Sequence, residues 1–157
     1  MKITDKLNKE TIIFLDGETR SDIIKELLDH LVEINYLETS DELFLSIDSR
    51  ETESSSDIGR GIAFPHSISK ELQELVCILG ISKSGIDYDN DVILPCHIIL
   101  LSLSPINNPD IHRKFISKFR SFMVDSNFKY QLIDSQSSEE IGKLLANWEI
   151  KQMEEEL

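Results

Sequence analysis

His66 is the residue of this sequence whose surroundings most clearly suggest chemistry. It directly follows Gly59-Arg-Gly-Ile-Ala-Phe-Pro65, which combines two glycines, a short apolar segment and a proline. Glycine permits backbone angles that a Cβ forbids, and proline favours an extended conformation in the residue before it. We therefore expect residues 62–64 to form a short buried strand with His66 at its end. A histidine held there can titrate near neutral pH and act as a nucleophile.

The other three histidines differ in their predicted settings. His112 falls in the first turn of a predicted helix after a proline-rich loop, so it and His66 can both be accessible on a rigid scaffold; two unrelated surface histidines would explain the same spacing. His30 lies beside the apolar stripe of a helix, so we expect a packing or surface role for it. His97 is next to Cys96 on a strand, and we interpret it as structural. Adjacent strand residues point to opposite faces, which argues against a shared metal at this pair. Without Cys-x-x-Cys or His-x-x-x-His spacing, no metal site is predicted.

Several polar residues near His66 could bind an anion. Ser54, Ser55 and Ser56 precede the glycine turn and read either as a plain linker or as hydroxyl and amide donors to an anion. Arg50 is either a surface charge or a bidentate ligand of a phosphate group. The sequence has no Gly-x-Ser-x-Gly elbow and no P-loop pattern, which argues against a serine hydrolase and a P-loop nucleotide site.

Composition limits the partners and the location. The 157 residues are 40% hydrophobic and carry a formal net charge of −13, which fits one domain spanning residues 1–157. The charge argues against nucleic acids and anionic membranes; it favours a basic protein partner or serves solubility alone. Cys77 and Cys96 lie in apolar segments and are expected to be buried thiols of a reducing cytosol. No membrane insertion is predicted, and the N-terminus lacks a signal core, so we expect a cytoplasmic protein.

The elements that must position these residues follow from hydrophobic periodicity. Apolar residues at helical spacing predict a helix over 19–35, capped by Thr19 or Ser21, and a second helix over 40–48. The polar segment 51–57 is expected to be a loop. Further elements are a strand over 75–82, a turn-rich segment over 84–91, an apolar run over 92–103 and helices over 110–124, 128–133 and from Ser137 or Ser138 onward.

Pro95 divides the long apolar run, which leaves 96–103 as the strand proper. Its near-continuous hydrophobicity is typical of a central strand covered on both faces. The last helix contains Trp148 in its apolar stripe, and residues 151–157 are expected to be a frayed tail. The order of helices, then strands, then helices indicates an α/β or α+β sandwich.

The residues around His66 resemble the mannitol/fructose/nitrogen class of enzyme IIA domains of the bacterial phosphoenolpyruvate-dependent phosphotransferase system. The shared pattern consists here of Arg50-Glu51, Ser55-Ser56, Ile58-Gly59 and Gly61-Ile-Ala-Phe-Pro-His66. His112 holds the place of a second histidine that opens a helix, and Gly80–Asp87 is similar to the strand and turn between them. The resemblance runs from Ile3 to about Trp148. It implies an α/β fold with a single-domain sandwich, in which helices flank a mixed β-sheet.

The resemblance also implies roles for individual residues. His66 would be the phosphohistidine, His112 would stabilise the site, and Arg50 would contact the phosphoryl group. Ser55 and Ser56, with the backbone amides of Gly59 and Gly61, would bind the phosphoryl oxygens. The implied donor is the phosphocarrier HPr or a relative of it, the implied acceptor is an enzyme IIB for sugar uptake, and no cofactor or metal is required.

Two alternatives and three departures accompany this resemblance. A nitrogen-type enzyme IIA would instead bind regulatory protein targets according to its phosphorylation state, and a degenerate member would bind without transferring phosphate. Retention of both His66 and His112 argues against the degenerate form. Arg60 replaces the asparagine common between the two glycines, and Ser56 replaces the usual threonine. Ser67 and Ile68 replace the small residue and arginine that often follow the histidine. We expect these changes to affect the choice of partner more than the chemistry.

Overall fold

A mixed β-sheet forms the middle layer of the molecule. The computed structural model describes residues 1–89 and 94–156, and in these the sheet has five strands. Their order is β1 (Ile12–Phe14), β4 (Val76–Ile86), β5 (Cys96–Pro105) and β2 (Ile62–Ala63), and β3 (His66–Ser69) also pairs with β5. β4 and β5 are antiparallel, and the other pairs are parallel.

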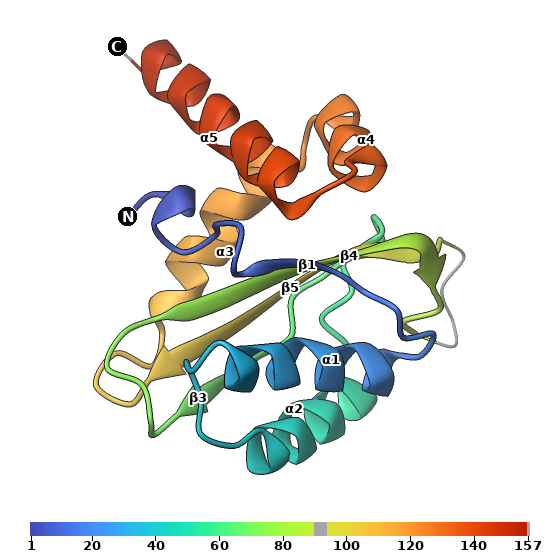
Figure 1. Ribbon diagram of the computed structural model, residues 1–157, viewed down its shortest axis with the longest axis vertical. Coiled ribbons are helices and arrows are strands. Elements are labelled where there is room, and N and C mark those ends of the chain that lie inside the picture. Colours follow the sequence, from blue (N-terminus) through green and yellow to red (C-terminus); the bar gives the residue numbers. More distant parts are fainter. Residues whose placement is uncertain (90–93, 157) are drawn as a thin grey trace.

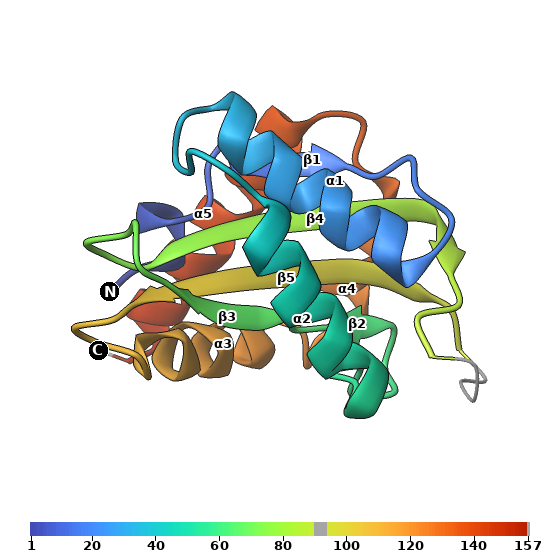
Figure 2. The same cartoon turned by 90° about the horizontal axis from the view of Figure 1, so that it is seen from below.

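Helices cover both faces of this sheet (Figure 1). α1 (Arg20–Glu33) and α2 (Asp41–Glu53) lie together on one face, where Figure 2 shows them in front of the strands. α3 (Ile111–Phe122), α4 (Ser126–Asp134) and α5 (Ser138–Glu155) lie on the opposite face with the 3₁₀ helix η1 (Ile3–Asp5). The expected α/β single-domain sandwich with a mixed sheet is confirmed.

The two faces of the sheet enclose two separate apolar cores. Leu79 and Ile81 of β4 pack in the core with α3, α4 and α5, whereas Val76 and Ile78 pack in the core with α1 and α2. Successive strand residues point to opposite faces, so a strand covered on both sides must be apolar throughout. β5 obeys the same rule and lies between β4 and the two short strands, which confirms its prediction as a central strand.

Helix boundaries on the α1/α2 face agree with expectation at their starts. The Thr19 side chain accepts a hydrogen bond from the Asp22 backbone N at 3.1 Å, so Thr19 is the cap of α1. α2 is longer than predicted, because residues 51–53, expected to be loop, continue the helix. Glu51 is buried there and hydrogen-bonded, and this tertiary contact outweighs the polar composition of the segment.

Strand boundaries show larger differences. β4 extends to Ile86, through part of the segment 84–91 expected to be turn, with a register shift in its pairing to β5 between Ile81 and Ile86. Residues 90–91 of that segment, and residues 92–93 of the predicted apolar run, lie outside the described residues. β1 and β3 were not predicted, because three and four residues are too few for a clear alternation.

The C-terminal half agrees more closely with the periodicity. α3 and α4 lie within two residues of the predicted ranges at each end, and Ser137 caps α5 by accepting a hydrogen bond from the Glu140 backbone N. α5 includes Lys151 to Glu155, most of the segment for which fraying stays a prediction. Among the described residues, we find no helix with the length and apolar character needed to span a membrane.

Candidate functional site

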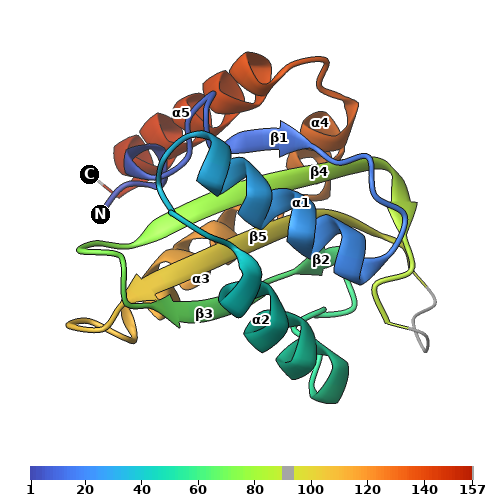
Figure 3. The same ribbon diagram turned by 60° about the horizontal axis from the view of Figure 1, so that its bottom comes forward.

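His66 begins a strand rather than ending one. β2 pairs with β5 at Ile98 and Ile99, and β3 pairs with it from Ser102 onward, so the two short strands follow one neighbour with a break at Phe64-Pro65 (Figure 3). Proline cannot donate to a sheet ladder, which explains the break. Before β2 the chain turns at Gly59 and Gly61, whose φ angles of 79° and 78° favour glycine.

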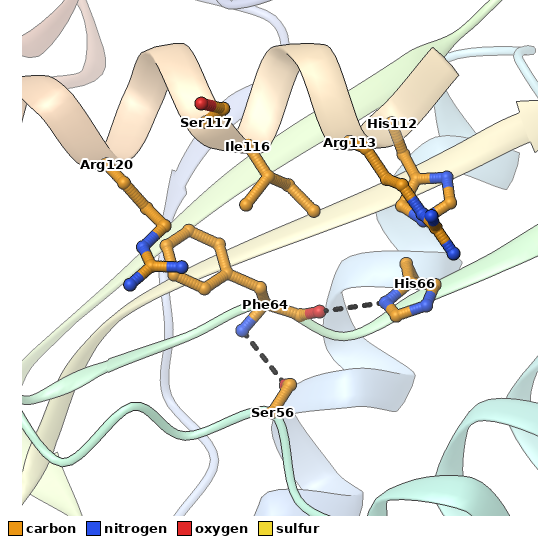
Figure 4. A pocket seen from close by; sticks show the side chains of 8 residues that line it. All are labelled: Ser56, Phe64, His66, His112, Arg113, Ile116, Ser117 and Arg120. Atoms are coloured by element: carbon orange, nitrogen blue, oxygen red, sulfur yellow. Dashed lines mark hydrogen bonds between the residues drawn. The ribbon is translucent and has the colours of Figure 1, made fainter. Parts of the chain in front are cut away.

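The His66 imidazole is held in one tautomer. Its Nδ1 lies 3.2 Å from the Phe64 backbone O, which can only accept a hydrogen bond, so Nδ1 carries the proton in the neutral ring (Figure 4). Nε2 then carries the lone pair. This is the arrangement that a nitrogen nucleophile needs, and the residue is partly exposed.

His112 stacks on this ring. The two ring centroids are 4.5 Å apart, with an angle of 19° between the planes. The His112 Nδ1 lies 3.1 Å from the Pro109 backbone O and 3.0 Å from the Ser104 Oγ, so it too is protonated at Nδ1 and leaves Nε2 free. The prediction that His112 is accessible is wrong, because it is only 8% exposed. Burial lowers its pKa, and positive charge at His66 and Arg113 adds to the effect.

A cavity of about 490 Å³ opens beside the two rings, under the face of α3. Figure 4 shows the side chains that surround it, with both imidazoles near one end and Arg120 near the other. The lining residues are Ser56, Phe64, His66, His112, Arg113, Ile116, Ser117 and Arg120. Among the described residues no carboxylate lines it, so the cavity presents positive and neutral donors and suits an anion.

The predicted phosphate ligands are placed unequally around this cavity. The Arg50 Nη1 donates to the His66 backbone O at 2.8 Å, so its guanidinium adjoins the histidine from the α2 side. Ser56 lines the cavity, but its Oγ also bonds Glu51 and the Phe64 backbone N. The Ser55 Oγ accepts from the Asp57 backbone N at 3.1 Å within the loop.

The two glycines shape the turn and are not part of the cavity wall. Neither Gly59 nor Gly61 is among its lining residues. Gly61 borders a different cavity of about 300 Å³, together with Arg60, His97 and Lys129. Their role as phosphate ligands therefore stays a prediction, as do the roles of Arg50 and the serines.

Arg113 and Arg120 were missed in the sequence, although both line the cavity. The available signal was charge: α3 has four basic residues and no acidic one in a chain of net charge −13. Glu51 was noted only as part of a pattern, and it proves to be a buried carboxylate at the site. The described residues contain no cluster of three or more histidine, cysteine or acidic side chains arranged for a metal ion.

Comparison with known proteins gives one family. The family model described as phosphoenolpyruvate-dependent sugar phosphotransferase system, EIIA 2, matches residues 5–148. The chain is 27% identical over 142 residues to the PTS system fructose-specific EIIABC component of Bacillus subtilis (strain 168). That match covers 90% of this chain and 22% of the relative, so the chain spans less than a quarter of that protein.

Solved structures share the fold. The nitrogen regulatory protein IIA-Ntr from Neisseria meningitidis aligns with a TM-score of 0.79 at 20% identity, covering 91% of this chain and 98% of that one. A chain in the complex of enzyme IIAMTL and phosphorylated enzyme IIBMTL from Escherichia coli aligns with a TM-score of 0.74 at 20% identity, covering 90% and 98%.

Proposed function

The chain belongs to the EIIA 2 family of the phosphoenolpyruvate-dependent sugar phosphotransferase system, and we propose that it carries a phosphoryl group on His66. The observation that carries this proposal is the geometry of the imidazole. Nδ1 is bonded to the Phe64 carbonyl, which leaves the Nε2 lone pair available beside a cavity lined with cationic side chains.

The transfer step needs only the His66 ring and the phosphorylated donor. The Nε2 lone pair of His66 forms the new bond to phosphorus, while the bond from phosphorus to the donor's leaving atom breaks and its electron pair stays on the donor. The His66 Nδ1 keeps its proton throughout and donates it in a hydrogen bond to the Phe64 backbone O. The positive charge that forms on the ring is therefore shared with a fixed acceptor. The reverse sequence delivers the phosphoryl group to the acceptor's nucleophile.

Donors from two helices stabilise the phosphoryl oxygens. The Arg113 guanidinium comes from the first turn of α3, and the Arg50 guanidinium comes from the last turn of α2. Phosphoryl transfer needs positioning and charge stabilisation more than covalent help, so fixed cations at this place are suitable. His112 is well suited as a neutral partner, because its lowered pKa avoids a second charge next to His66.

The proposed donor is an HPr-like phosphocarrier, and the proposed acceptor is an enzyme IIB protein or domain. The open cavity supports transfer between proteins, since a partner's reacting atom must reach Nε2. The complex of enzyme IIAMTL with phosphorylated enzyme IIBMTL contains a chain of the same fold, which supports an enzyme IIB as acceptor. Both cysteines are unpaired and buried, which is compatible with the proposed cytoplasmic location.

A regulatory role is the second candidate, and it would use the same histidine. The fold match to the nitrogen regulatory protein IIA-Ntr is the observation in its favour. In that case phosphorylation of His66 would switch the binding of target proteins instead of feeding a sugar permease. Transfer of label from the phosphorylated chain to a panel of enzyme IIB proteins distinguishes the two.

The test of the shared step uses phosphoenolpyruvate, enzyme I and HPr. We expect the chain to acquire one phosphate that is labile in acid and stable in alkali, and we expect His66→Ala to acquire none. The matched control is His30→Ala, because His30 is bonded to the Glu10 backbone O away from the cavity. Equal labelling of His66→Ala and the parent chain would end the proposal.

A further inference from the structure

We propose that Glu51 is a positioning residue that fixes the reactive tautomer of His66 through Ser56 and Phe64. The inference rests on the proposed function in taking His66 as the reacting group. It assigns a role to a buried carboxylate that the transfer step itself does not use.

Glu51 is a buried carboxylate that is held by several hydrogen-bond donors. It lies in the last turn of α2 and is only 3% exposed. Its Oε2 accepts hydrogen bonds from the Ser56 backbone N at 2.9 Å, the Ser56 Oγ at 2.8 Å and the Tyr88 hydroxyl at 2.8 Å. A carboxylate is costly to bury unless donors surround it, so three converging donors indicate a specific arrangement.

Tyr88 anchors this carboxylate from the sheet side. It is 2% exposed, and burial together with the charge of Glu51 raises its pKa, so its hydroxyl keeps the proton that it donates. The position of Glu51 is therefore fixed by the core and not by solvent.

Ser56 connects the carboxylate to the backbone in front of the histidine. Its hydroxyl donates to Glu51 and accepts from the Phe64 backbone N at 3.0 Å. The carbonyl of Phe64 is the group that receives the His66 Nδ1 proton at 3.2 Å. The Ser56 side chain and the Phe64 backbone thus link Glu51 to the imidazole (Figure 4 shows the last two hydrogen bonds).

The segment Phe64–His66 is held at each of its three residues. The Phe64 backbone N donates to the Ser56 Oγ. The Ser102 backbone N donates to the Pro65 O at 3.1 Å. The Arg50 guanidinium donates to the His66 backbone O. Arg50 and Glu51 are adjacent in sequence in one helical turn, and each supports a different end of this segment.

This support has a chemical consequence, because neutral imidazole exchanges between two tautomers. Only the form with the proton on Nδ1 has its lone pair on Nε2. If the Phe64 carbonyl moves, this preference weakens and fewer molecules are competent to accept phosphate. A role of Glu51 in stability alone would lower the free energy of unfolding without altering the tautomer, which makes the two roles separable.

The test is ¹⁵N NMR of the histidine rings in the full, unphosphorylated chain, at a pH where His66 is neutral. We expect the parent chain to hold its proton on Nδ1. Glu51→Ala and Ser56→Ala should raise the share of neutral His66 rings protonated on Nε2 at least about fivefold. This is the change in a tautomer equilibrium that the loss of one hydrogen bond produces. Glu51→Gln, which keeps an acceptor oxygen, and Ser56→Thr, which keeps the hydroxyl, should restore most of the parent tautomer. Glu53→Ala, on the exposed side of the same helical turn, is the control.

Parent-like tautomer ratios in folded Glu51→Ala and Ser56→Ala would overturn the proposal. If Glu51→Ala does not fold, Ser56→Ala decides, since it removes the link and leaves the carboxylate with Tyr88. The readout needs no phosphoryl donor. Failure of His66 to accept phosphate would therefore reject the proposed function while leaving the tautomer result standing, and the two failures are distinguishable.

Discussion

His66 and His97 are held in the same way, yet they have different surroundings. Each lies on a strand of the sheet, and each has its Nδ1 against a backbone carbonyl: Phe64 O at 3.2 Å for His66, and Ser82 O at 2.8 Å for His97. A fixed tautomer is thus not what distinguishes the candidate nucleophile, since a structural histidine has one as well.

The difference lies at the other ring nitrogen. The His97 Nε2 lies against the backbone of β4, where a Cβ added to Gly85 would be 3.0 Å from it. His66 instead stacks on a second imidazole, and both rings line a cavity of about 490 Å³ together with Arg113. The site therefore arises where α2, α3 and the β2–β3 break meet at one ring, and not from the ring's own hydrogen bond.

Replacing His66 or His97 by alanine gives the largest expected contrast in the rate of phosphate incorporation. His66→Ala should lower the rate of phosphate incorporation by on the order of a thousandfold or more, because the nucleophile is gone. His97→Ala should stay within about twofold of the parent rate. Labelling from phosphoenolpyruvate through enzyme I and HPr measures both, and a large loss in His97→Ala alone would reverse the assignment.

The second imidazole should matter next. His112→Ala removes the ring that stacks on His66 and positions it, so we expect the transfer rate to fall about a hundredfold. His30→Ala serves as the control, since its ring bonds the Glu10 backbone O elsewhere in the molecule. Single-turnover rates with phosphorylated HPr measure this effect. A rate within twofold of the parent would show that this stacking does not position His66 for transfer.

A smaller effect is expected from one cation at the cavity. Arg113→Gln should slow transfer about tenfold, because one charge near the phosphoryl oxygens is lost. Lys114→Gln removes the same charge from the next residue of α3, which does not line the cavity, and should change the rate less than twofold. Equal effects of the two variants in the same assay would mean that only the overall charge of α3 matters.

The pH dependence of stability gives the smallest contrast. Burial lowers the pKa of His112 in the folded chain, with the charges of His66 and Arg113 adding to it. Below about pH 6.5 the unfolded chain therefore binds more protons at this residue, and the free energy of unfolding falls as the pH drops toward the lowered pKa. His112→Gln should flatten this part of the curve in urea titrations, while His30→Gln should not. An unchanged slope in His112→Gln would contradict the account.

Long periodic elements and the central strand could be predicted from the sequence, because their patterns are local. Thr19 was one of two predicted caps, and the position of His112 in the first turn of α3 was correct. β1 and β3 were missed, since short strands depend on pairing with β4 and β5. The extension of α2 to Glu53 depends on a buried contact between Glu51 and Tyr88, which are 37 residues apart.

The site was predictable only where a motif or helix position marked it. His66 and His112 were selected by their place in the chain, and the structure brings their rings into contact. Arg113 and Arg120 were not found, because the choice of which basic residues face a cavity depends on the rotation of α3 over the sheet. Arg50, Ser55, Gly59 and Gly61 do not line the cavity, and their contact with the phosphoryl group stays a prediction.

The most direct test of the central claim is ¹H–¹⁵N–³¹P NMR of the phosphorylated, ¹⁵N-labelled chain. We predict a coupling between phosphorus and the Nε2 of His66, with Nδ1 of the same ring still protonated, and unphosphorylated rings at His97 and His112. A phosphorus coupling to Nδ1 of His66, or to a nitrogen of any other histidine, would contradict the account.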